Sequence, residues 1–378
     1  MLNRFSKWTL GVIALTLARA IMIALMFLDV PKLDYHVGWA FYHGGDEFLY
    51  FKVANDILAG KFLFTTVSGG WAFVVALATW LTQADHYEAT LPVLTPLNGI
   101  FLSVCSVWLV ARLTRLLTAD DSQSLLAAAV WTFSPYLLWV AFSFFPKAMA
   151  LQNVYVPRQL WLNGLTDAPS IFLVMLGAVL LLKAHQTQNA NRLIWIGSGV
   201  MFGLALSIRI HTLAMIAPMW FALLLARRWR ELLWVVLGSV IGFAPQFVYN
   251  GLVGNIFDTP YISNWLRPQN GGISFEWNNT PFSPRFLLSN LITITRGNIL
   301  LMIVGVAAAG AAAFAFVRAW RLRGGVEAII MFVAPLASFG LHVTAYLFLD
   351  DPIRFSMPAI TLGLPAMVWT LFARPTRS

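Results

Sequence analysis

Residues 44–60, which read GGDEFLYFKVANDILAG, follow the first long apolar segment and decide how the chain is interpreted. Two adjacent glycines break the chain at the start of this stretch, and Gly60 ends a helix whose apolar residues recur at helical spacing. Asp46 and Glu47 stand in its first turn, where the helix dipole favours negative charge. The stretch therefore predicts a short amphipathic helix that lies on a membrane surface and begins with two carboxylates.

The composition is that of a membrane protein. Apolar residues make up 59% of the 378 residues, charged residues make up 11%, and the mean hydropathy is +0.73. A soluble domain carries about 25% charged residues, so most of this chain is expected to contact lipid. The single cysteine, Cys105, excludes an intrachain disulfide.

About ten apolar segments approach the length of roughly 20 residues that a membrane-spanning helix needs. They cover residues 8–28, 91–112, 123–145, 169–184, 192–210, 212–228, 232–249, 298–317, 325–348 and 355–373. The run 70–82 is shorter and predicts an interfacial or re-entrant helix. We therefore expect an all-α, polytopic membrane helix bundle that forms one transmembrane domain over residues 1–378, with interfacial helices in its first outer loop.

The distribution of charge gives the topology. With a cytoplasmic N-terminus, fourteen of the twenty-five basic residues fall on one side, in short loops and tails. They are Arg4, Lys7, Arg112, Arg115, Lys183, Arg192, Arg227, Arg228, Arg230, Arg318, Arg321, Arg323, Arg374 and Arg377. Because basic loops stay cytoplasmic, both termini are predicted in the cytoplasm, and a bacterial inner membrane is the expected location. The net charge of +9 is then a topology signal and does not indicate a nucleic-acid partner.

The long segments all fall on the opposite, extracytoplasmic side. They are the first loop at 29–90, a second at 146–168 and a large loop at 250–297, and a short turn at 350–354 lies on the same side. Twelve of the sixteen carboxylates lie there as well. Because long ordered loops tend to carry function, we expect the functional site on this face.

Asp46 and Glu47 have two interpretations when they are judged by spacing alone. They can cap and solubilise the helix, as acidic first turns commonly do. Alternatively, one carboxylate faces a cavity at the outer membrane surface and acts as a general base, or the pair holds a divalent cation through its oxygens.

The pattern from Asp46 through Glu47, Tyr50, Ala54 and Ile57 to the closing glycine resembles the first outer loop of the GT-C glycosyltransferases. This superfamily includes the protein O-mannosyltransferases and the lipid A aminoarabinose transferases. Further matches follow along the chain in the same order as in the family. They are Arg19 in the first span, Leu206-Ser207-Ile208-Arg209, Tyr249-Asn250 before Gly254-Asn255, and Arg354-Phe355-Ser356-Met357-Pro358.

The resemblance implies a GT-C-like fold and a sugar donor carried on a polyprenyl phosphate. It implies that an acceptor hydroxyl on a glycan, lipid or protein attacks the sugar while a carboxylate removes its proton. Asp46 is the predicted base, and Glu47 is its positioning partner or a cation ligand. The growing charge on the leaving phosphate needs cations. The candidates on the outer side are Arg209, His211, Arg354, Lys147 and Arg158.

Each of these residues also has a structural interpretation. Lys147 and Arg158 can extend to lipid headgroups, and Arg354 can pair with Asp351 or its neighbour Asp350. Asp167 stands two residues before Pro169, so it can be the N-cap of a helix that has a proline in its first turn. The alternative for Asp167, and also for Asp351, is the role of a second catalytic acid.

Two other functions are compatible with a polytopic chain. A secondary transporter would also contain many spans, although matching broken helices in two halves are not evident in the sequence. A non-catalytic scaffold in envelope glycan assembly is the second alternative, since a shared fold does not guarantee activity.

Overall fold

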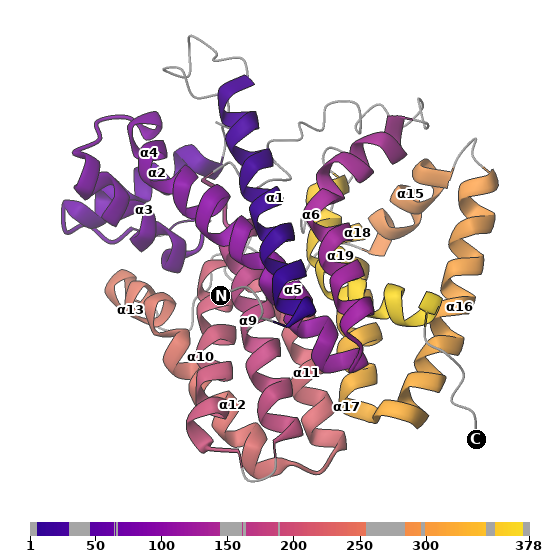
Figure 1. The fold of residues 1–378 in the computed structure, drawn as a ribbon. Coiled ribbons are helices and arrows are strands. Elements are labelled where there is room, and N and C mark those ends of the chain that lie inside the picture. The colour runs from indigo at the N-terminus through magenta and orange to yellow at the C-terminus, as the bar shows by residue number, and fades with distance from the viewer. Residues whose placement is uncertain are drawn as a thin grey trace.

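The computed structural model describes residues 6–29, 46–63, 65, 67–143, 161, 164–187, 190–254, 284–295, 299–344 and 352–372. Every regular element in these ranges is helical, which confirms the all-α prediction (Figure 1). In chain order the elements are α1 (Lys7–Asp29), α2 (Asp46–Leu58), α3 (Gly69–Thr82), η3 (Tyr87–Thr90), α4 (Leu91–Thr95), η4 (Pro96–Leu102), α5 (Ser103–Thr118), α6 (Asp121–Ser143), α9 (Asp167–Gln186), α10 (Arg192–Ile208), η5 (Ile210–Thr212), α11 (Leu213–Leu225), α12 (Trp229–Gly242), α13 (Ala244–Val253), α15 (Pro284–Thr295), α16 (Ile299–Arg323), α17 (Gly325–Ala328), η7 (Ile329–Val333), α18 (Ala334–Val343) and α19 (Pro352–Phe372).

Each apolar segment of the sequence coincides with a helix or a run of helices. In the described part of the chain, four helical segments are long and apolar enough to cross a membrane, and a fifth is added if α12 and α13 count as one bent span. Other apolar helices are shorter, such as α10. The protein is a multi-pass membrane protein, and the number of ten spans stays a prediction. The span predicted at 232–249 coincides with α12 and α13, a pair of helices bent by 48°.

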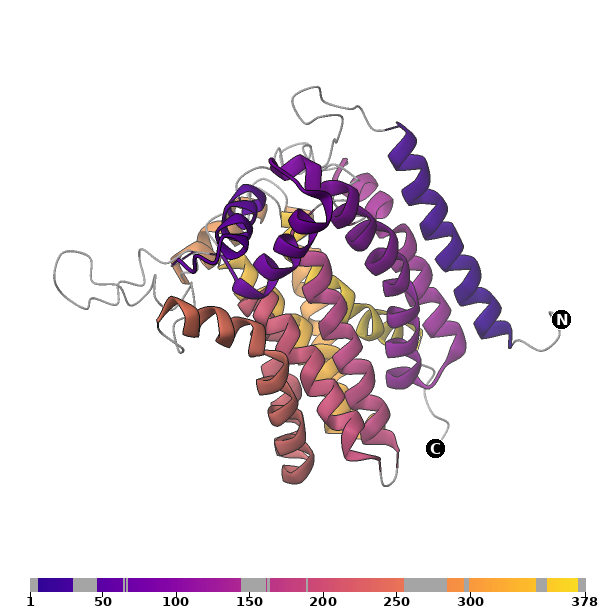
Figure 2. The same cartoon turned by 90° about the vertical axis from the view of Figure 1, so that its left-hand side faces the viewer.

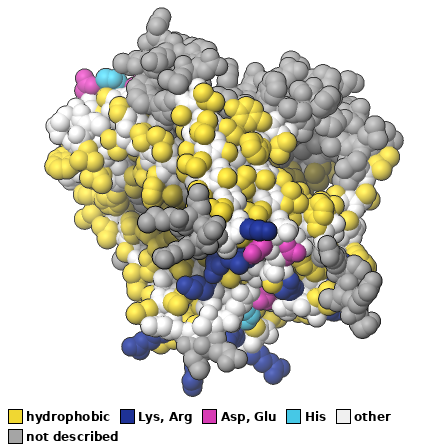
Figure 3. All heavy atoms as spheres, viewed as in Figure 1, with side chains coloured by type: hydrophobic (Ala, Val, Ile, Leu, Met, Phe, Trp, Pro, Cys, Tyr) yellow, Lys and Arg dark blue, Asp and Glu magenta, His cyan; other side chains and the backbone are white. Residues whose placement is uncertain are grey.

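The basic side chains gather at one end of the bundle, which we call the basic end. It is formed by the final two turns of α5 and α16, the last turn of α9, the first turns of α10 and α12, and the turn between α11 and α12. These parts together carry Arg112, Arg115, Lys183, Arg192, Arg227, Arg228, Arg230, Arg318, Arg321 and Arg323. Figure 3 shows the Lys and Arg side chains in the lower part of the molecule, below a largely apolar surface. The charge asymmetry of the sequence is therefore an asymmetry of the folded bundle.

Glycines bring α10 and α12 into backbone contact. Gly199 and Gly203 on α10 face Gly238 and Gly242 on α12, each spaced four residues apart. A Cβ added to Gly203 would lie 2.1 Å from the Ser239 carbonyl oxygen, so no larger residue fits there. Small residues at this spacing are typical of closely packed membrane helices, where van der Waals contact drives association.

Arg19 fixes α1 to the bundle. Its guanidinium is fully buried and donates hydrogen bonds to the Ser103 hydroxyl at 3.0 Å and to the carbonyl oxygens of Trp131 and Thr132 at 3.2 and 3.0 Å. It also lies over the Trp131 ring, 5.5 Å from the ring centroid. A charge inside a membrane bundle needs such partners, so the contacts made by Arg19 account for it as a structural tie between α1, α5 and α6.

Helices α2 and α3 and the turn η3 form a layer over the end of the bundle opposite the basic end (Figure 2), and we call this layer the cap. The apolar face of α2 is buried in it, through Tyr50, Val53 and Ala54. These side chains pack in one cluster with Trp71 of α3 and Tyr249 of α13. The expectation that this face rests on lipid is therefore corrected, because the face is covered by protein.

Candidate functional site

Glu47 lies in the first turn of α2 with no exposed surface. Its Oε1 accepts a hydrogen bond from the backbone nitrogen of Gly164 at 3.1 Å. Gly164 belongs to the short segment that precedes α9, so this bond joins the first outer segment to the second. A carboxylate accepting a backbone N–H is a strong, charge-assisted contact, and Glu47 uses it to position the start of α2.

The segment 164–167 receives contacts from three more elements. Trp71 of α3 donates from Nε1 to the Gly164 carbonyl at 2.8 Å, and Asn98 of η4 donates from Nδ2 to the Leu165 carbonyl at 3.2 Å. Tyr87 packs so closely that a Cβ on Gly164 would lie 1.8 Å from its hydroxyl oxygen. Only glycine fits at this point, and the segment is fixed from several sides.

Asp167 begins α9 and forms a buried ion pair with Arg209, which follows the last residue of α10. Arg209 Nη1 donates to Asp167 Oδ1, and both side chains are about one-tenth exposed. The N-cap of α9 is Thr166, so the interpretation of Asp167 as the N-cap is corrected. Instead, the Asp167 carboxylate balances the charge of the arginine that was predicted to bind the donor phosphate.

His211 lies in the turn η5, two residues after Arg209. Both of its ring nitrogens are buried, and its ring stands perpendicular to that of His342, with 6.2 Å between the ring centroids. His342 is itself buried on α18, where its Nδ1 lies 2.7 Å from the Ser338 carbonyl oxygen. The two histidines thus pack together, one of them in the turn that directly follows Arg209.

The cap is attached to the end of α10 by polar contacts. The Ser68 hydroxyl donates to the Ile208 carbonyl oxygen, and it also lies 3.0 Å from the Tyr50 hydroxyl. The backbone nitrogen of Gly69 donates to Gln246 Oε1 of α13 at 2.9 Å. These bonds place the start of α3 next to Arg209 and next to the bend that follows α12.

Three of the predicted site residues are thus brought to one place. Glu47, Asp167 and Arg209 meet around the segment 164–167. Other predicted site residues lie outside the described residues: Lys147, Arg158 and Asp351 entirely, and Asp46 and Arg354 in their side chains. The backbone of Asp46 is the first residue of α2, and that of Arg354 lies in the first turn of α19.

Sequence reasoning did not single out Trp71, Asn98, Tyr87 and Gly164. The only signal for Gly164 was its position in an outer loop, just before a predicted span. The side chains that contact it come from residues 77–117 positions earlier in the chain, and no local pattern relates them to it.

No group of three or more His, Cys, Asp or Glu side chains that could hold a metal ion occurs among the described residues. Glu47 accepts the Gly164 N–H and Asp167 is paired with Arg209. The carboxylates of Glu47 and Asp167 therefore do not form a cation site together. The cation site predicted at Asp46 and Glu47 stays a prediction.

Residues 145–249 match the sequence profile of a family described as dolichyl-phosphate-mannose-protein mannosyltransferase. The matched segment includes Gly164, Asp167, Arg209 and His211. No curated protein sequence matches the chain.

The fold resembles that of the oligosaccharyltransferase from the archaeon Archaeoglobus fulgidus, a GT-C glycosyltransferase. Its apo structure aligns with a TM-score of 0.53 and 13% sequence identity, over 95% of this chain and 50% of that one. A complex of the same enzyme with an inhibitory peptide and a dolichol-phosphate aligns with a TM-score of 0.52 and 14% identity, over 95% of this chain and 50% of that one. A complex with Zn and sulfate aligns with a TM-score of 0.51 and 15% identity, over 94% of this chain and 49% of that one.

The chain therefore spans about half the length of the solved proteins it resembles. The GT-C-like fold expected from the sequence is confirmed.

Proposed function

We propose that this chain is a membrane glycosyltransferase that moves a sugar from a polyprenyl-phosphate-linked donor to an acceptor hydroxyl. The reaction would take place under the cap, at the end of the bundle opposite the basic end. This end would face away from the cytoplasm, with both termini cytoplasmic and the protein in a bacterial inner membrane. The family match over residues 145–249 and the dolichol-phosphate complex of the archaeal enzyme support a lipid-phosphate donor.

In this proposal Asp46 is the general base. Its carboxylate takes the proton of the acceptor hydroxyl as that oxygen attacks the anomeric carbon. The bond between the anomeric carbon and the phosphate oxygen breaks, and the lipid phosphate leaves with the electron pair. A positioned base typically contributes about 10²–10⁴ in rate.

The observation that carries the proposal is the meeting of Glu47, Asp167 and Arg209 around residues 164–167. Glu47 is the positioning residue, since its bond to Gly164 places the preceding residue, Asp46, at the same end of the bundle. Arg209 supplies the cation for the leaving phosphate, and Asp167 orients its guanidinium. A second-acid role for Asp167 is less favoured, because its carboxylate already serves Arg209.

The remaining cations of the sequence prediction complete the proposed donor site. His211 stands two residues after Arg209, and Arg354 lies in the first turn of α19. Lys147 and Arg158 belong to the same outer segment as Gly164. These four residues, with Asp351 as an alternative acid, are candidates for variants once the donor has been identified.

The donor is identified first, by mass spectrometry of the lipids that co-purify with the full chain. Transfer is then measured in proteoliposomes with that lipid-linked sugar for the wild type, Asp46→Asn and Asp56→Asn. Asp56 is a matched control because it is an aspartate on the same helix, ten residues later. We expect Asp46→Asn to lose about 10²–10⁴ in rate with unchanged thermal stability, and Asp56→Asn to keep normal transfer.

Undiminished transfer by Asp46→Asn would show that Asp46 is not the base. Movement of a solute across the bilayer without any lipid-linked sugar would replace the proposal with the transporter alternative. A chain that carries no lipid-linked sugar, and whose deletion leaves every glycan intact, would contradict enzymatic function altogether.

A further inference from the structure

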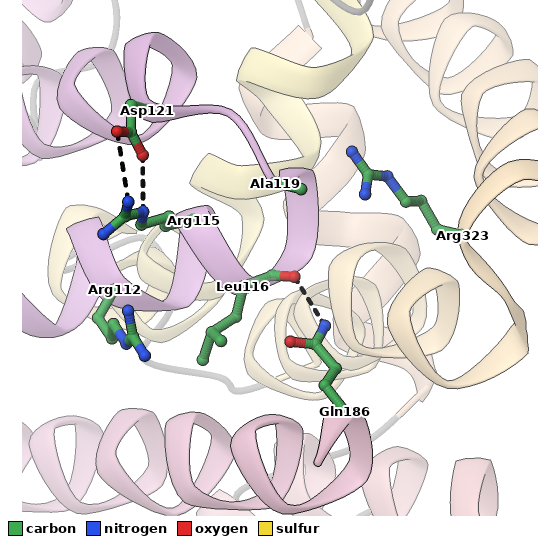
Figure 4. Close-up of a pocket in the computed structure, with 7 residues that line it drawn as sticks. All are labelled: Arg112, Arg115, Leu116, Ala119, Asp121, Gln186 and Arg323. Atoms are coloured by element: carbon green, nitrogen blue, oxygen red, sulfur yellow. Dashed lines mark hydrogen bonds and ion pairs between the residues drawn. The ribbon is translucent and has the colours of Figure 1, made fainter. Parts of the chain in front are cut away.

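A pocket of about 670 Å³ opens at the basic end of the bundle, at the opposite end of α9 from Asp167. It lies between the ends of α5, α9 and α16 and the start of α6 (Figure 4). Its lining residues are Arg112, Arg115, Leu116, Ala119, Asp121, Gln186 and Arg323. Three guanidinium groups and one carboxylate therefore face the same space, so the lining carries an excess of positive charge.

Several of these polar groups are already used to hold the walls. Arg115 Nε lies 2.6 Å from Asp121 Oδ1, and the Arg115 guanidinium lies over the Trp8 ring at 4.5 Å. Arg323 donates to the Thr118 carbonyl oxygen, and Gln186 donates to the Leu116 carbonyl oxygen at 2.8 Å. The last carbonyl groups of α5 are thus bonded to neighbouring helices, which fixes the shape of the pocket.

Arg112 differs from its neighbours. Its side chain makes no hydrogen bond or ion pair with any other residue that the structure describes, and it is half-buried one turn before Leu116. The nearby carboxylates are occupied elsewhere. Asp120 Oδ1 accepts hydrogen bonds from the backbone N–H groups of Ser122 and Gln123. Glu327 Oε1 accepts a hydrogen bond from Gln186 Nε2 at 3.4 Å. Arg112 is therefore the cation that remains available to a ligand.

Phosphate groups suit this pocket, since arginine binds them through paired hydrogen bonds. The surface beside the pocket favours a lipid as the source of the phosphate. On α16, the turns before Arg323 expose Phe314, Val317 and Trp320, which recur every three residues along one face, by 42–73%. An acyl chain can lie along this apolar face while its headgroup reaches the arginines, and basic pockets between membrane helices commonly bind anionic headgroups.

We propose that this pocket binds the phosphate of an anionic phospholipid headgroup, with Arg112 as its principal contact. Arg115 and Arg323 add long-range attraction from opposite walls, and the paired Asp121 keeps Arg115 in place. The proposal does not depend on the glycosyltransferase function, because the pocket lies at the other end of the bundle.

The test is native mass spectrometry of the full chain in detergent, titrated separately with phosphatidylglycerol and with phosphatidylcholine. The variants are Arg112→Gln and Arg321→Gln. Arg321 is the matched control because it is an exposed arginine at the same end of the bundle that does not line the pocket. We expect Arg112→Gln to weaken phosphatidylglycerol binding about tenfold, the loss of one charge-assisted contact. Arg321→Gln should bind like the wild type, and phosphatidylcholine binding should not change.

Equal losses in both variants would overturn the proposal, because diffuse charge attraction would then explain the binding. No loss in either variant would also overturn it. A parallel titration with inorganic phosphate separates the two sources of the anion. Phosphate binding that depends on Arg112, without selective phosphatidylglycerol binding, would assign the pocket to a soluble phosphate and reject the lipid.

Arg112→Lys keeps the test decisive if Arg112→Gln is not recovered in folded form. Lysine retains the charge but lacks the planar fork of arginine. Phosphatidylglycerol binding should then fall by a few-fold, again with normal binding in Arg321→Gln. Wild-type affinity in Arg112→Lys and unselective binding of both lipids would reject the site.

Discussion

The carboxylate of Glu47 accepts the backbone N–H of Gly164 at 3.1 Å, across 117 residues of sequence. This single bond connects the helix that begins with Asp46 to the segment that leads into Asp167. A buried carboxylate carries a large desolvation cost unless it is hydrogen-bonded, so the bond ties the position of α2 to that of the segment 164–167.

Replacing Glu47 with alanine is expected to destabilise the cap and to abolish transfer. Loss of a hydrogen bond to a charged group costs about 1.5–3 kcal/mol. Glu47→Gln keeps a carbonyl acceptor of similar shape and should lie between Glu47→Ala and the wild type. Thermal unfolding in detergent and transfer activity measure the two effects. Asn55→Ala, on the exposed face of α2, is the control and should leave both unchanged. Wild-type stability in Glu47→Ala would show that this bond does not hold the cap.

The Asp167–Arg209 pair is expected to behave as one unit in a double-mutant cycle. Removing either partner leaves a buried, uncompensated charge, which costs about 3–5 kcal/mol. Asp167→Asn with Arg209→Gln should cost much less than the sum of the single changes. The same cycle on the more exposed Arg115–Asp121 pair should give only about 0.2–1 kcal/mol of coupling. Additive effects at Asp167 and Arg209 would contradict a direct interaction.

Gly203→Ala should loosen the contact between α10 and α12. The new Cβ would meet the Ser239 carbonyl at 2.1 Å, and overpacking of this kind costs about 1–3 kcal/mol. Gly197→Ala is the matched control on the same helix, because its Cβ would meet only a Leu180 methyl at 3.9 Å. The control should be neutral or slightly stabilising. Equal melting temperatures for the two variants would argue against close backbone packing.

Gly164→Ala should disrupt the segment before α9, and Tyr87→Phe should partly rescue it. The added Cβ lies 1.8 Å from the Tyr87 hydroxyl oxygen but 3.1 Å from the ring carbon that bears it. Removing the hydroxyl therefore relieves most of the collision. The yield of folded protein and its transfer activity report the rescue. A double variant no better than Gly164→Ala would place the origin of the defect elsewhere.

Site-directed labelling can test the proposed orientation. Cys105 is the single native cysteine, so a Cys105→Ser background permits placement of one new cysteine at a time. Ala59→Cys, after α2, should react with a membrane-impermeant thiol reagent added outside intact cells. Ala226→Cys, also at an exposed alanine but at the basic end, should react only after the cells are opened. The reverse pattern would place the proposed site in the cytoplasm.

The positions of the helices could be predicted from the sequence because each depends on local apolar composition. The end of α2 also follows a local signal, because Gly60 has a φ of 69°, a conformation that glycine adopts readily. The bend between Gly242 and Ala244 was not predicted, since an apolar run has the same composition whether it is straight or broken.

The site was predicted as separate residues but not as an arrangement. Asp167 and Arg209 were both recognised, yet their pairing depends on how α9 packs against α10, which spacing does not specify. Likewise, the acidic start of α2 was evident, whereas the partner of Glu47 is a backbone N–H in a distant turn. A backbone donor leaves no signature in the identities of the residues around it.

The four glycines between α10 and α12 also constrain how a substrate can enter. Neither helix can slide or rotate without driving its backbone into the other, so the end of α10 that carries Arg209 is a stationary platform. The cap contacts this platform through the Ser68 hydroxyl, which donates to the Ile208 carbonyl oxygen at the end of α10, while Gly69 and Glu47 bond to α13 and to the segment before α9. We therefore expect a bulky lipid-linked molecule to gain access by lifting the cap, while the bundle beneath it stays rigid.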